Sequence, residues 1–340
     1  MRKLPRRDYL ALSTLTIASL AGCSGDDSPE SGNGSQSTPS SDDQPTDSTD
    51  STPTAASGGA KNVRVGEVAA GENLAMVIER VEQTTQIGDF QQADDGNEFV
   101  VVTLAVKNTT ESTFLNFSNF LQTSVKDSAE YSYDPTLAVT DNSFQGGQLA
   151  PGEVSRGDIV YEVPTDASGL ALQFDFEAFS FTSLDRVTVD LASQADTIAT
   201  LEQTLRVDVH DVGNRITVGD ISVAATDVSF TRRLGDFAQA DSGKEYVVID
   251  ITTENGTDEQ QYISTLLQML VKDGAGNSYD MDLLAQSELD RGYNEGQPLA
   301  PGETRRGQLA YEVPQDASPL YWIFEFTLWT DGDKTFWKLR

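Results

Sequence analysis

Hydrophobic and polar residues alternate along several stretches of the chain, most clearly in its second half. A period of two places successive side chains on opposite faces of the backbone, which is typical of a β-strand with one buried face. Clusters of turn-forming residues, such as ADDGN, NGTDE, APGE and DGAGN, separate these stretches. The residues expected on inward faces are Val247, Ile249 and Ile251; Leu309, Tyr311 and Val313; and Leu320, Trp322, Phe324, Phe326 and Leu328.

The pattern occurs twice. LAPGEVSRGDIVYEVPTDAS, which begins at Leu149, returns as LAPGETRRGQLAYEVPQDAS at Leu299, with 14 of 20 positions identical. Two copies of ordinary domain size indicate a duplication rather than a solenoid, which needs at least three shorter units. The other pairs begin at Ile87 and Leu234 and at Leu121 and Leu267, and the offsets in chain order are 147, 146 and 150.

Short strands separated by turns, without a βαβ rhythm, favour an antiparallel sandwich. We therefore predict an all-β protein with two tandem immunoglobulin-like antiparallel β-sandwiches. The expected domains are residues 61–192 and 205–340, joined by a linker at 193–204 that is either a short helix or plain chain.

The N-terminus predicts export and lipid attachment. Arg6 and Arg7 resemble a twin-arginine export signal, and the uncharged run that follows is shorter than the roughly 20 residues that a membrane-spanning helix needs. Cys23, the single cysteine, follows Leu-Ala-Gly in a sequence that resembles a lipobox. We expect residues 1–22 to be a signal peptide and Cys23 to carry the lipid that anchors the chain to the outer face of the membrane.

Residues 23–60 contain almost only small and polar residues, so they predict a disordered tether between the anchor and the domains. The whole chain has a formal net charge of −31, with acidic residues spread along its length. This charge disfavours nucleic acid as a partner. It resembles the surfaces of proteins from halophilic archaea, because molar salt screens the repulsion that such a charge creates.

Several motifs resemble one known family. Gly66 and Glu67, the stretches NEFVVVTLAVKN and VKDSAEYSYD, and the motifs LAPGE, RG and YEVP are similar to the telokin-like, immunoprotective-extracellular domain family, over residues 61–180 and 207–330. The resemblance implies an immunoglobulin-type sandwich, an extracytoplasmic setting and no catalytic residues. The second copy departs from the pattern at its start, where HDVGN partly replaces VGEVAAGEN, so its first strand is less well defined.

Few residues suggest chemistry. A zinc site needs several Cys or His ligands, whereas the chain has Cys23 and one histidine, His210, which we expect at a strand edge facing solvent. A Ser-His-acid triad would have to use His210, and no Gly-x-Ser-x-Gly motif is present. We therefore predict no catalytic residues and no cofactor.

Calcium is the exception that the sequence leaves open. The loop VKDGAGNSYDMD carries oxygen ligands around glycines but does not match the twelve-residue calcium loop. We interpret it as a hairpin turn, and the candidate ligands, should calcium bind, are Asp273, Asn277 and Asp280.

Three sequons allow glycosylation. Asn108 and Asn255 are equivalent in the two copies and are expected at exposed strand ends, whereas Asn116 lies in an apolar stretch and is a weaker candidate. Of the three tryptophans, Trp322 is expected in the core, and Trp329 and Trp337 are expected to pair across a hairpin.

These observations predict a non-enzymatic, lipid-anchored surface module that binds an unknown surface protein or glycan. Two alternatives belong to other classes. One is a lipoprotein that captures a solute or cation for a transporter, which usually needs a cleft between α/β lobes. The other is a cell-envelope hydrolase, for which the nucleophile and base motifs are missing.

Overall fold

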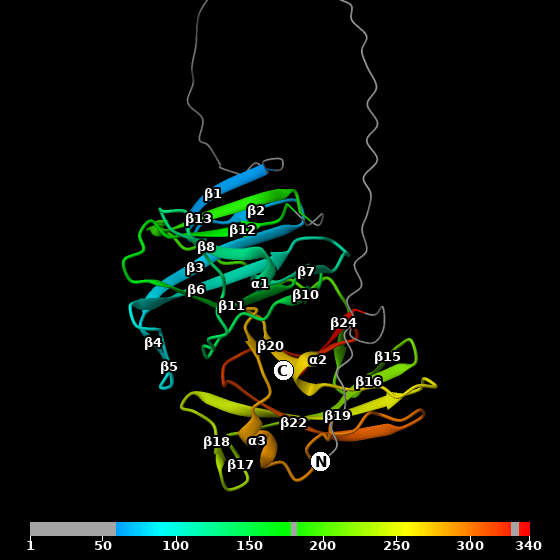
Figure 1. Cartoon of the computed structure of the whole chain (residues 1–340). Helices are drawn as coiled ribbons and strands as arrows, with labels where there is room; N and C mark the ends of the chain where they lie inside the picture. Colours follow the sequence, from blue (N-terminus) through cyan, green and yellow to red (C-terminus); the bar gives the residue numbers. More distant parts are fainter. Residues whose placement is uncertain (1–58, 178–181, 328–332) are drawn as a thin grey trace, which may run out of the picture. The chain divides into compact units, whose positions relative to one another are not determined.

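The computed structural model describes residues 59–177, 182–327 and 333–340. Two β-sandwich domains (Figure 1) are formed by strands β1 to β13 and β14 to β24. Both lie in one compact unit of the chain, residues 53–340. Within the described ranges, no helix has the length and apolar character to cross a membrane. The predicted all-β fold with two tandem domains is therefore confirmed.

Domain 1 (residues 59–194) packs two sheets around a buried aliphatic and aromatic core. One sheet has the strand order β1-β13-β12-β8-β9 and the other has the order β11-β6-β3-β2. Two small elements complete the domain, the hairpin β4-β5 and the pair β7-β10. The strands are β1 (Gly59–Val65), β2 (Ala69–Ala70), β3 (Leu74–Thr84), β4 (Gln86–Ile87), β5 (Gln91–Gln92), β6 (Asn97–Asn108), β7 (Leu115–Phe117), β8 (Thr123–Lys126), β9 (Ser132–Tyr133), β10 (Gly147–Leu149), β11 (Val154–Pro164), β12 (Ala171–Asp175) and β13 (Leu184–Gln194), and the helix α1 is Asn119–Gln122.

Domain 2 (residues 205–340) repeats this plan with the orders β14-β24-β23-β20-β21 and β15-β16-β19-β22, plus the hairpin β17-β18. Its strands are β14 (Val209–Asp211), β15 (Arg215–Val218), β16 (Ile221–Thr231), β17 (Arg233–Leu234), β18 (Ala238–Gln239), β19 (Lys244–Asn255), β20 (Met269–Asp273), β21 (Ser278–Tyr279), β22 (Thr304–Pro314), β23 (Leu320–Glu325) and β24 (Lys334–Lys338), and its helices are α2 (Thr265–Gln268) and α3 (Leu283–Ser287).

The inward positions expected from the alternating pattern are all buried where the structure describes them, and Leu328 lies outside the described residues. Trp322 is in the core, as predicted. Trp337 is buried directly opposite Trp322 on β23 and β24, with ring centroids 5.0 Å apart. The predicted partner of Trp337, Trp329, lies outside the described residues.

One strand pair in each domain departs from the antiparallel prediction. β1 runs parallel to β13, and β14 runs parallel to β24, so the first strand of each copy lies beside the last. The first strand of domain 2 is present but shorter, with three residues against seven in domain 1. The shortening follows the sequence departure at HDVGN.

The segment between the domains is extended chain that packs against domain 1. Ala199 and Leu201 cover a small apolar cluster of domain 1. The backbone N–H groups of Thr204 and Arg206 donate to the carbonyls of Gly152 and Pro151, each over 2.9 Å. The predicted linker is therefore fixed along its length rather than hanging free.

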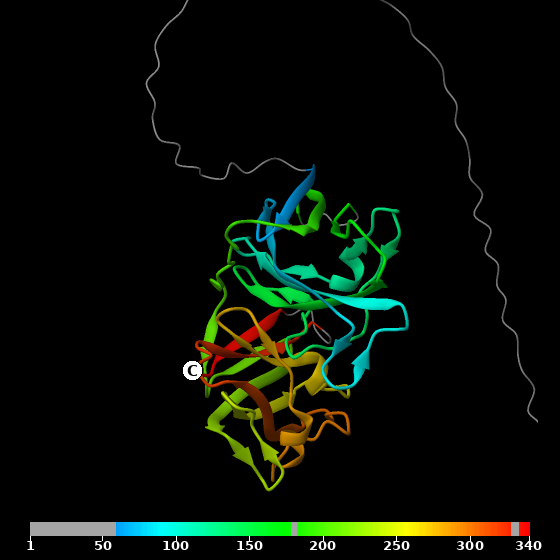
Figure 2. The ribbon, with the colours of Figure 1, turned by 90° about the vertical axis from the view of Figure 1, so that its left-hand side faces the viewer.

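A buried ion cluster joins the two domains. Glu153, in the turn before β11, is fully buried and lies 2.5 Å from Lys272 Nζ on β20 and 2.7 Å from Lys334 Nζ on β24. Ala150 packs beside it against Ile323 and Phe336 of domain 2. Figure 2 shows β24, in red, at the boundary between the domains. A charge pair that is desolvated in this way holds its partners in one geometry.

The sheet face formed by β20, β23 and β24 in domain 2 is more apolar than its counterpart in domain 1. In domain 2, Leu270, Tyr321, Ile323 and Phe336 provide the apolar surface that faces domain 1. By strand register, the equivalent residues of domain 1 are Ser124, Ala171, Gln173 and Thr188. Domain 1 therefore lacks the apolar face on which a further domain could dock.

Candidate functional site

The residues predicted from sequence fall into three groups. Arg6, Arg7 and Cys23 lie outside the described residues, so export and lipid attachment stay predictions. His210 is half-buried on the edge strand β14, with its ring centroid 6.0 Å from that of Trp337. The sequons and the calcium candidates all lie within the described residues.

The predicted exposure of two sequons is wrong. Asn108 and Asn255 are fully buried, and their Nδ2 groups donate to the carbonyls of Leu149 and Leu299, each over 2.9 Å. Each Nδ2 also donates to a second carbonyl, and each Oδ1 accepts from a backbone N–H. Asn116 is exposed on β7. The turn-forming residues correctly indicated the end of a strand. They did not indicate that the asparagine amide at that end hydrogen-bonds to two other segments of the chain.

The loop proposed for calcium is a hairpin turn between β20 and β21, as interpreted from sequence. Asp273 Oδ1 accepts from the N–H groups of Ala275 and Asn277, and Oδ2 accepts from Asn277 Nδ2 and the Tyr279 hydroxyl, all at 2.9 Å. Asp280 instead accepts from Gln145 of domain 1. Among the described residues, no three His, Cys, Asp or Glu side chains are grouped to hold a metal. The turn thus has its own hydrogen bonds, and calcium binding stays a prediction.

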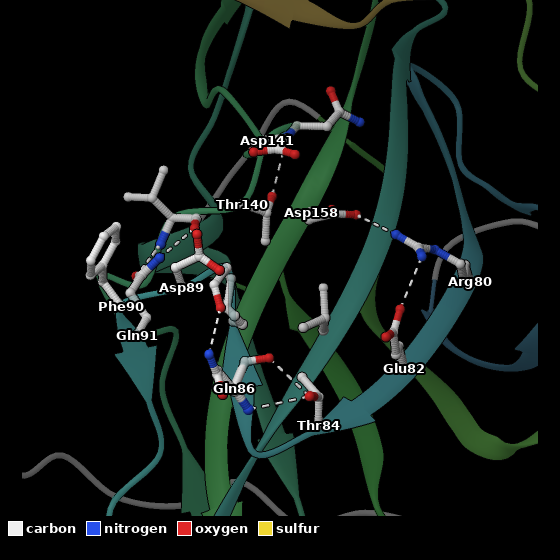
Figure 3. A pocket seen from close by; sticks show the side chains of 15 residues that line it. Arg80, Glu82, Thr84, Gln86, Asp89, Phe90, Gln91, Thr140, Asp141 and Asp158 are labelled. Atoms are coloured by element: carbon white, nitrogen blue, oxygen red, sulfur yellow. Dashed lines mark hydrogen bonds and ion pairs between the residues drawn. The ribbon is translucent and has the colours of Figure 1, made fainter. Parts of the chain in front are cut away.

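The most site-like feature is a hollow of about 520 Å³ on domain 1, here named the domain 1 hollow. It lies over β3, β6 and β11 and is bounded by the β4-β5 hairpin and by loop residues 139–142 (Figure 3). Its volume falls within the 300–1,000 Å³ that is common for small-ligand sites. The lining residues are Arg80, Glu82, Thr84, Gln86, Ile87, Gly88, Asp89, Phe90, Gln91, Val101, Val139, Thr140, Asp141, Asn142 and Asp158.

A difference in loop length explains the hollow. In domain 1, the N–H of Thr136 donates to Val160 and the carbonyl of Asn142 accepts from Asp158. Asp282 and Arg291 make the equivalent bonds in domain 2. Five residues, 137–141, therefore span a gap in domain 1 that eight residues, 283–290, span in domain 2.

The longer loop of domain 2 forms α3 over the equivalent part of its sheet. Gln286 on α3 donates to the carbonyl of Gln308 and accepts from the N–H of Ala310. Ala285 is fully buried against Tyr246 and Ala310.

In domain 1 the shorter loop covers the equivalent position with Ala138, which packs on Phe99 and Val160, and the hollow opens beside this cluster. Three of the four positions by which the repeat offset rises from 146 to 150 lie in this loop, and this rise is the signal that would have located the site.

One wall of the hollow is a fixed polar network. Arg80 Nε donates to Thr103 Oγ1 (3.2 Å), and its Nη atoms lie 3.0 Å from Glu82 Oε2 and 3.6 Å from Asp158 Oδ1. Thr103 donates in turn to Asp158 over 2.6 Å. Figure 3 shows this group opposite Asp89 and Phe90.

The facing wall is held by hydrogen bonds between the hairpin and the loop. The Gln91 side chain donates to the carbonyl of Val139 (2.7 Å) and accepts from its N–H (2.8 Å). At the hairpin tip, Gly88 has φ +57°, a left-handed conformation that glycine adopts without strain. The tip presents Phe90, whose side chain is 96 % exposed. Asp89 and Asp141 make no hydrogen bond or ion pair with other described residues.

A second hollow of about 540 Å³ adjoins the first across residues 139–142 and is lined on its other side by domain 2. Its lining includes Asp280, Asp282 and Glu312, with Lys244 paired to Glu312 at 2.9 Å. Burial raises the pKa of Asp280 above its ordinary value. The loop is therefore a shared wall between two acidic hollows.

The fold and this geometry define a class: a tandem β-sandwich protein in which one copy carries an open, ligand-sized hollow. The chain belongs to the family described as "Domain of unknown function (DUF4352)", which matches residues 63–183 and 210–334, once in each domain. Among curated proteins, none matches the chain significantly.

Several solved structures are similar to the chain at low sequence identity. An uncharacterised β-sandwich protein from Clostridium difficile is 21 % identical, with a TM-score of 0.29, and the match covers 39 % of this chain and 95 % of that one. The yjhA protein of Bacillus subtilis is 16 % identical (TM-score 0.32; 38 % and 99 % covered). MPT63, a secreted protein from Mycobacterium tuberculosis, is 11 % identical (TM-score 0.30; 38 % and 95 % covered).

Proposed function

We propose that this protein is a non-enzymatic, lipid-anchored binding module on the outer face of the cell membrane, and that its ligand enters the domain 1 hollow. One observation carries the proposal: the loop at 137–141 is three residues shorter than its counterpart in domain 2, and a ligand-sized hollow lies beside it. The duplication supplies its own comparison, because the second copy shows the same fold with the longer loop.

The walls of the hollow support binding because they are held before any ligand arrives. Gln91 pins the loop at Val139, and the carbonyl of Asn142 accepts from the N–H of Asp158 over 2.7 Å. Preorganised walls reduce the conformational entropy that the protein loses when a ligand binds. Binding sites also commonly lie on loops that a rigid scaffold positions.

Cys23 and the pair Arg6-Arg7 support the proposed location. The polar residues 23–60 would let the two domains stand away from the membrane, since a flexible chain of this length spans about 35 Å on average. The net charge of −31 supports a high-salt setting of the halophilic archaeal kind.

The test compares the full chain with a loop-graft variant in which residues 137–141 are replaced by residues 283–290 of its own second copy. Thermal shift at constant ionic strength is measured against a broad panel of saccharides, amino acids, peptides, polyamines and divalent cations. We expect a saturable rise in melting temperature with at least one compound for the natural chain and none for the loop-graft variant. Identical responses of both chains to the whole panel would contradict a role for the hollow.

The anchor is tested separately. Cys23→Ser should release the protein from the membrane fraction into the medium. Retention of the variant on the membrane would contradict lipid attachment at this residue.

A further inference from the structure

We infer that the domain 1 hollow takes a neutral saccharide, with a sugar ring lying against Phe90. This inference rests on the proposed function and adds the chemical class of the ligand. It follows from the exposed ring at the rim, the apolar and polar parts of the lining, and the sign of the charge around it.

The ring of Phe90 has no packing role that explains its position. It is 96 % exposed at the tip of a hairpin whose shape depends on Gly88, not on the ring. Exposed apolar surface of this kind is unfavourable in water until another apolar surface covers it. A sugar ring offers such a surface, because one face carries mainly C–H groups.

The lining combines apolar surface with hydrogen-bonding groups, and a sugar requires both. Ile87, Val101 and Val139 contribute apolar surface. Around them, the free carboxylates of Asp89 and Asp141 can accept hydrogen bonds from hydroxyl groups, and the Arg80 guanidinium can donate to a ring or hydroxyl oxygen. A wholly apolar ligand would bury these polar groups without partners, which is unfavourable.

The charge of the lining disfavours anionic ligands. The lining holds four carboxylates, those of Glu82, Asp89, Asp141 and Asp158, against the single guanidinium of Arg80. Glu82 and Asp158 already engage that guanidinium. Phosphate, uronate or nucleotide groups would therefore meet net repulsion. In molar salt the Debye length is about 3 Å, so the attraction of a cation and the repulsion of an anion are both weakened, whereas stacking and hydrogen bonding to a neutral ligand persist.

Phe237 is the matched control that the duplication provides. It occupies the equivalent hairpin tip in domain 2 and is 77 % exposed. Its backbone N–H, with that of Asp236, points at Glu288 just beyond α3, where domain 2 is filled. A general effect of losing an exposed aromatic ring would weaken binding in both Phe90→Ala and Phe237→Ala. Loss of a saccharide contact would weaken binding only in Phe90→Ala.

The experiment is isothermal titration calorimetry of the full chain carrying Cys23→Ser, at constant high salt. The probes are the neutral tetrasaccharides cellotetraose, maltotetraose, mannotetraose and N-acetylchitotetraose, with tetragalacturonate and spermine as charged probes. We expect at least one neutral tetrasaccharide to bind saturably and tetragalacturonate not to bind. Phe90→Ala should weaken the binding at least about tenfold, Phe237→Ala should leave it within about twofold, and the loop-graft variant should abolish it.

Other results overturn the inference. No saturation by any neutral probe up to about 10 mM, or equal losses in Phe90→Ala and Phe237→Ala, would remove the saccharide. Saturable binding of spermine alone, abolished by the loop graft, would replace the saccharide with a cation while leaving the proposed function standing. Indifference of both chains to every compound in the broader panel would instead remove the proposed function itself.

Discussion

The carboxylate of Glu153 and the ammonium of Lys272 lie 2.5 Å apart, although 119 positions of the chain separate them, and both side chains are buried. Glu153 comes from the APGE turn of domain 1. The same turn in domain 2 leaves Glu303 half-buried, where it pairs with Arg305. One motif thus joins two domains in the first copy and caps a solvent-facing turn in the second.

Glu153→Gln should destabilise the whole protein by about 3–5 kcal/mol, because it leaves two lysines buried without their counter-charge. The free energy of unfolding, from denaturant titration followed by tryptophan fluorescence, measures this loss. Glu303→Gln is the control and should cost much less, since that ion pair is only partly buried and its loss leaves no cation fully buried without a counter-charge. Equal effects of the two substitutions would show that the buried cluster does not hold the domains together.

The stabilisation from Glu153 should vanish in acid. Burial raises the pKa of its carboxyl, but Lys272 and Lys334 outweigh burial, and the pKa lies below the ordinary value of about 4.5. A lowered pKa in the folded state means that the stabilisation is complete above the ordinary pKa and is lost as the pH falls through the folded value. The difference in unfolding free energy between the natural chain and Glu153→Gln should therefore be constant near neutrality and shrink only below about pH 4.5. A difference that already shrinks between pH 7 and pH 5 would contradict this assignment.

Asn108→Ala and Asn255→Ala should each cost about 1–3 kcal/mol, because each removes the amide that satisfies two backbone carbonyls. Asn116→Ala is the control and should change stability by no more than about 0.5 kcal/mol, since that side chain is exposed. Mass spectrometry of the exported protein tests the matching expectation for glycans. A glycan on Asn108 or Asn255 of the folded protein would contradict their burial.

Domain 1 should gain a docking face if it is given the residues of domain 2. A variant that carries the equivalent apolar side chains in domain 1, and in which Glu303 no longer pairs with Arg305, should assemble head to tail. Such contacts join different surfaces of successive molecules, so they produce open chains rather than closed oligomers. Light scattering would show growth with concentration, and adding Glu303→Gln should restore monomers. The substitutions are Ser124→Leu, Ala171→Tyr, Gln173→Ile, Thr188→Phe and Arg305→Ser. A variant that stays monomeric would mean that other contacts set the joint between the domains.

Transfer from about 3 M to about 0.1 M salt should lower the melting temperature. A net charge of −31 repels itself, and dilute buffer leaves that repulsion unscreened. Sucrose at equal osmolality controls for water activity. A flat response across this range would contradict adaptation to high salt.

The sequence was informative wherever its signal was periodic or repeated. The inward positions of β19, β22 and β23 follow from alternation, because a sheet with one buried face leaves few other solutions. The candidate site did not follow from alternation or from the matching positions of the repeat, and only the change in repeat offset marked it. Phe90 and Asp158 are brought together by tertiary folding, and the hollow between them exists because a loop is three residues shorter than its duplicate. Alternation says nothing about the length of a loop.

The burial of Asn108 shows a second limit. An Asn followed by a hydroxyl residue at a strand end is common in exposed turns, and composition alone does not distinguish a solvent-facing amide from one that two carbonyls have captured. Likewise, alternation with Val247, Ile249 and Ile251 places Val248 and Asp250 on the outer face of β19, yet both are buried. Val248 and Asp250 lie on a sheet whose outer face is partly covered by other side chains, and the period of two does not reveal such cover.

The missing three residues also affect how this protein can evolve. Residues 137–141 lie between two fixed anchor points on β11, and Ala138 alone packs on a buried cluster of domain 1, so the rest of the loop can change with little effect on the sandwich. A new loop sequence that destabilises domain 1 can be compensated by domain 2, because the buried ion cluster is expected to couple the unfolding of the two domains. One duplicate is thereby free to diversify its specificity while the other preserves the fold.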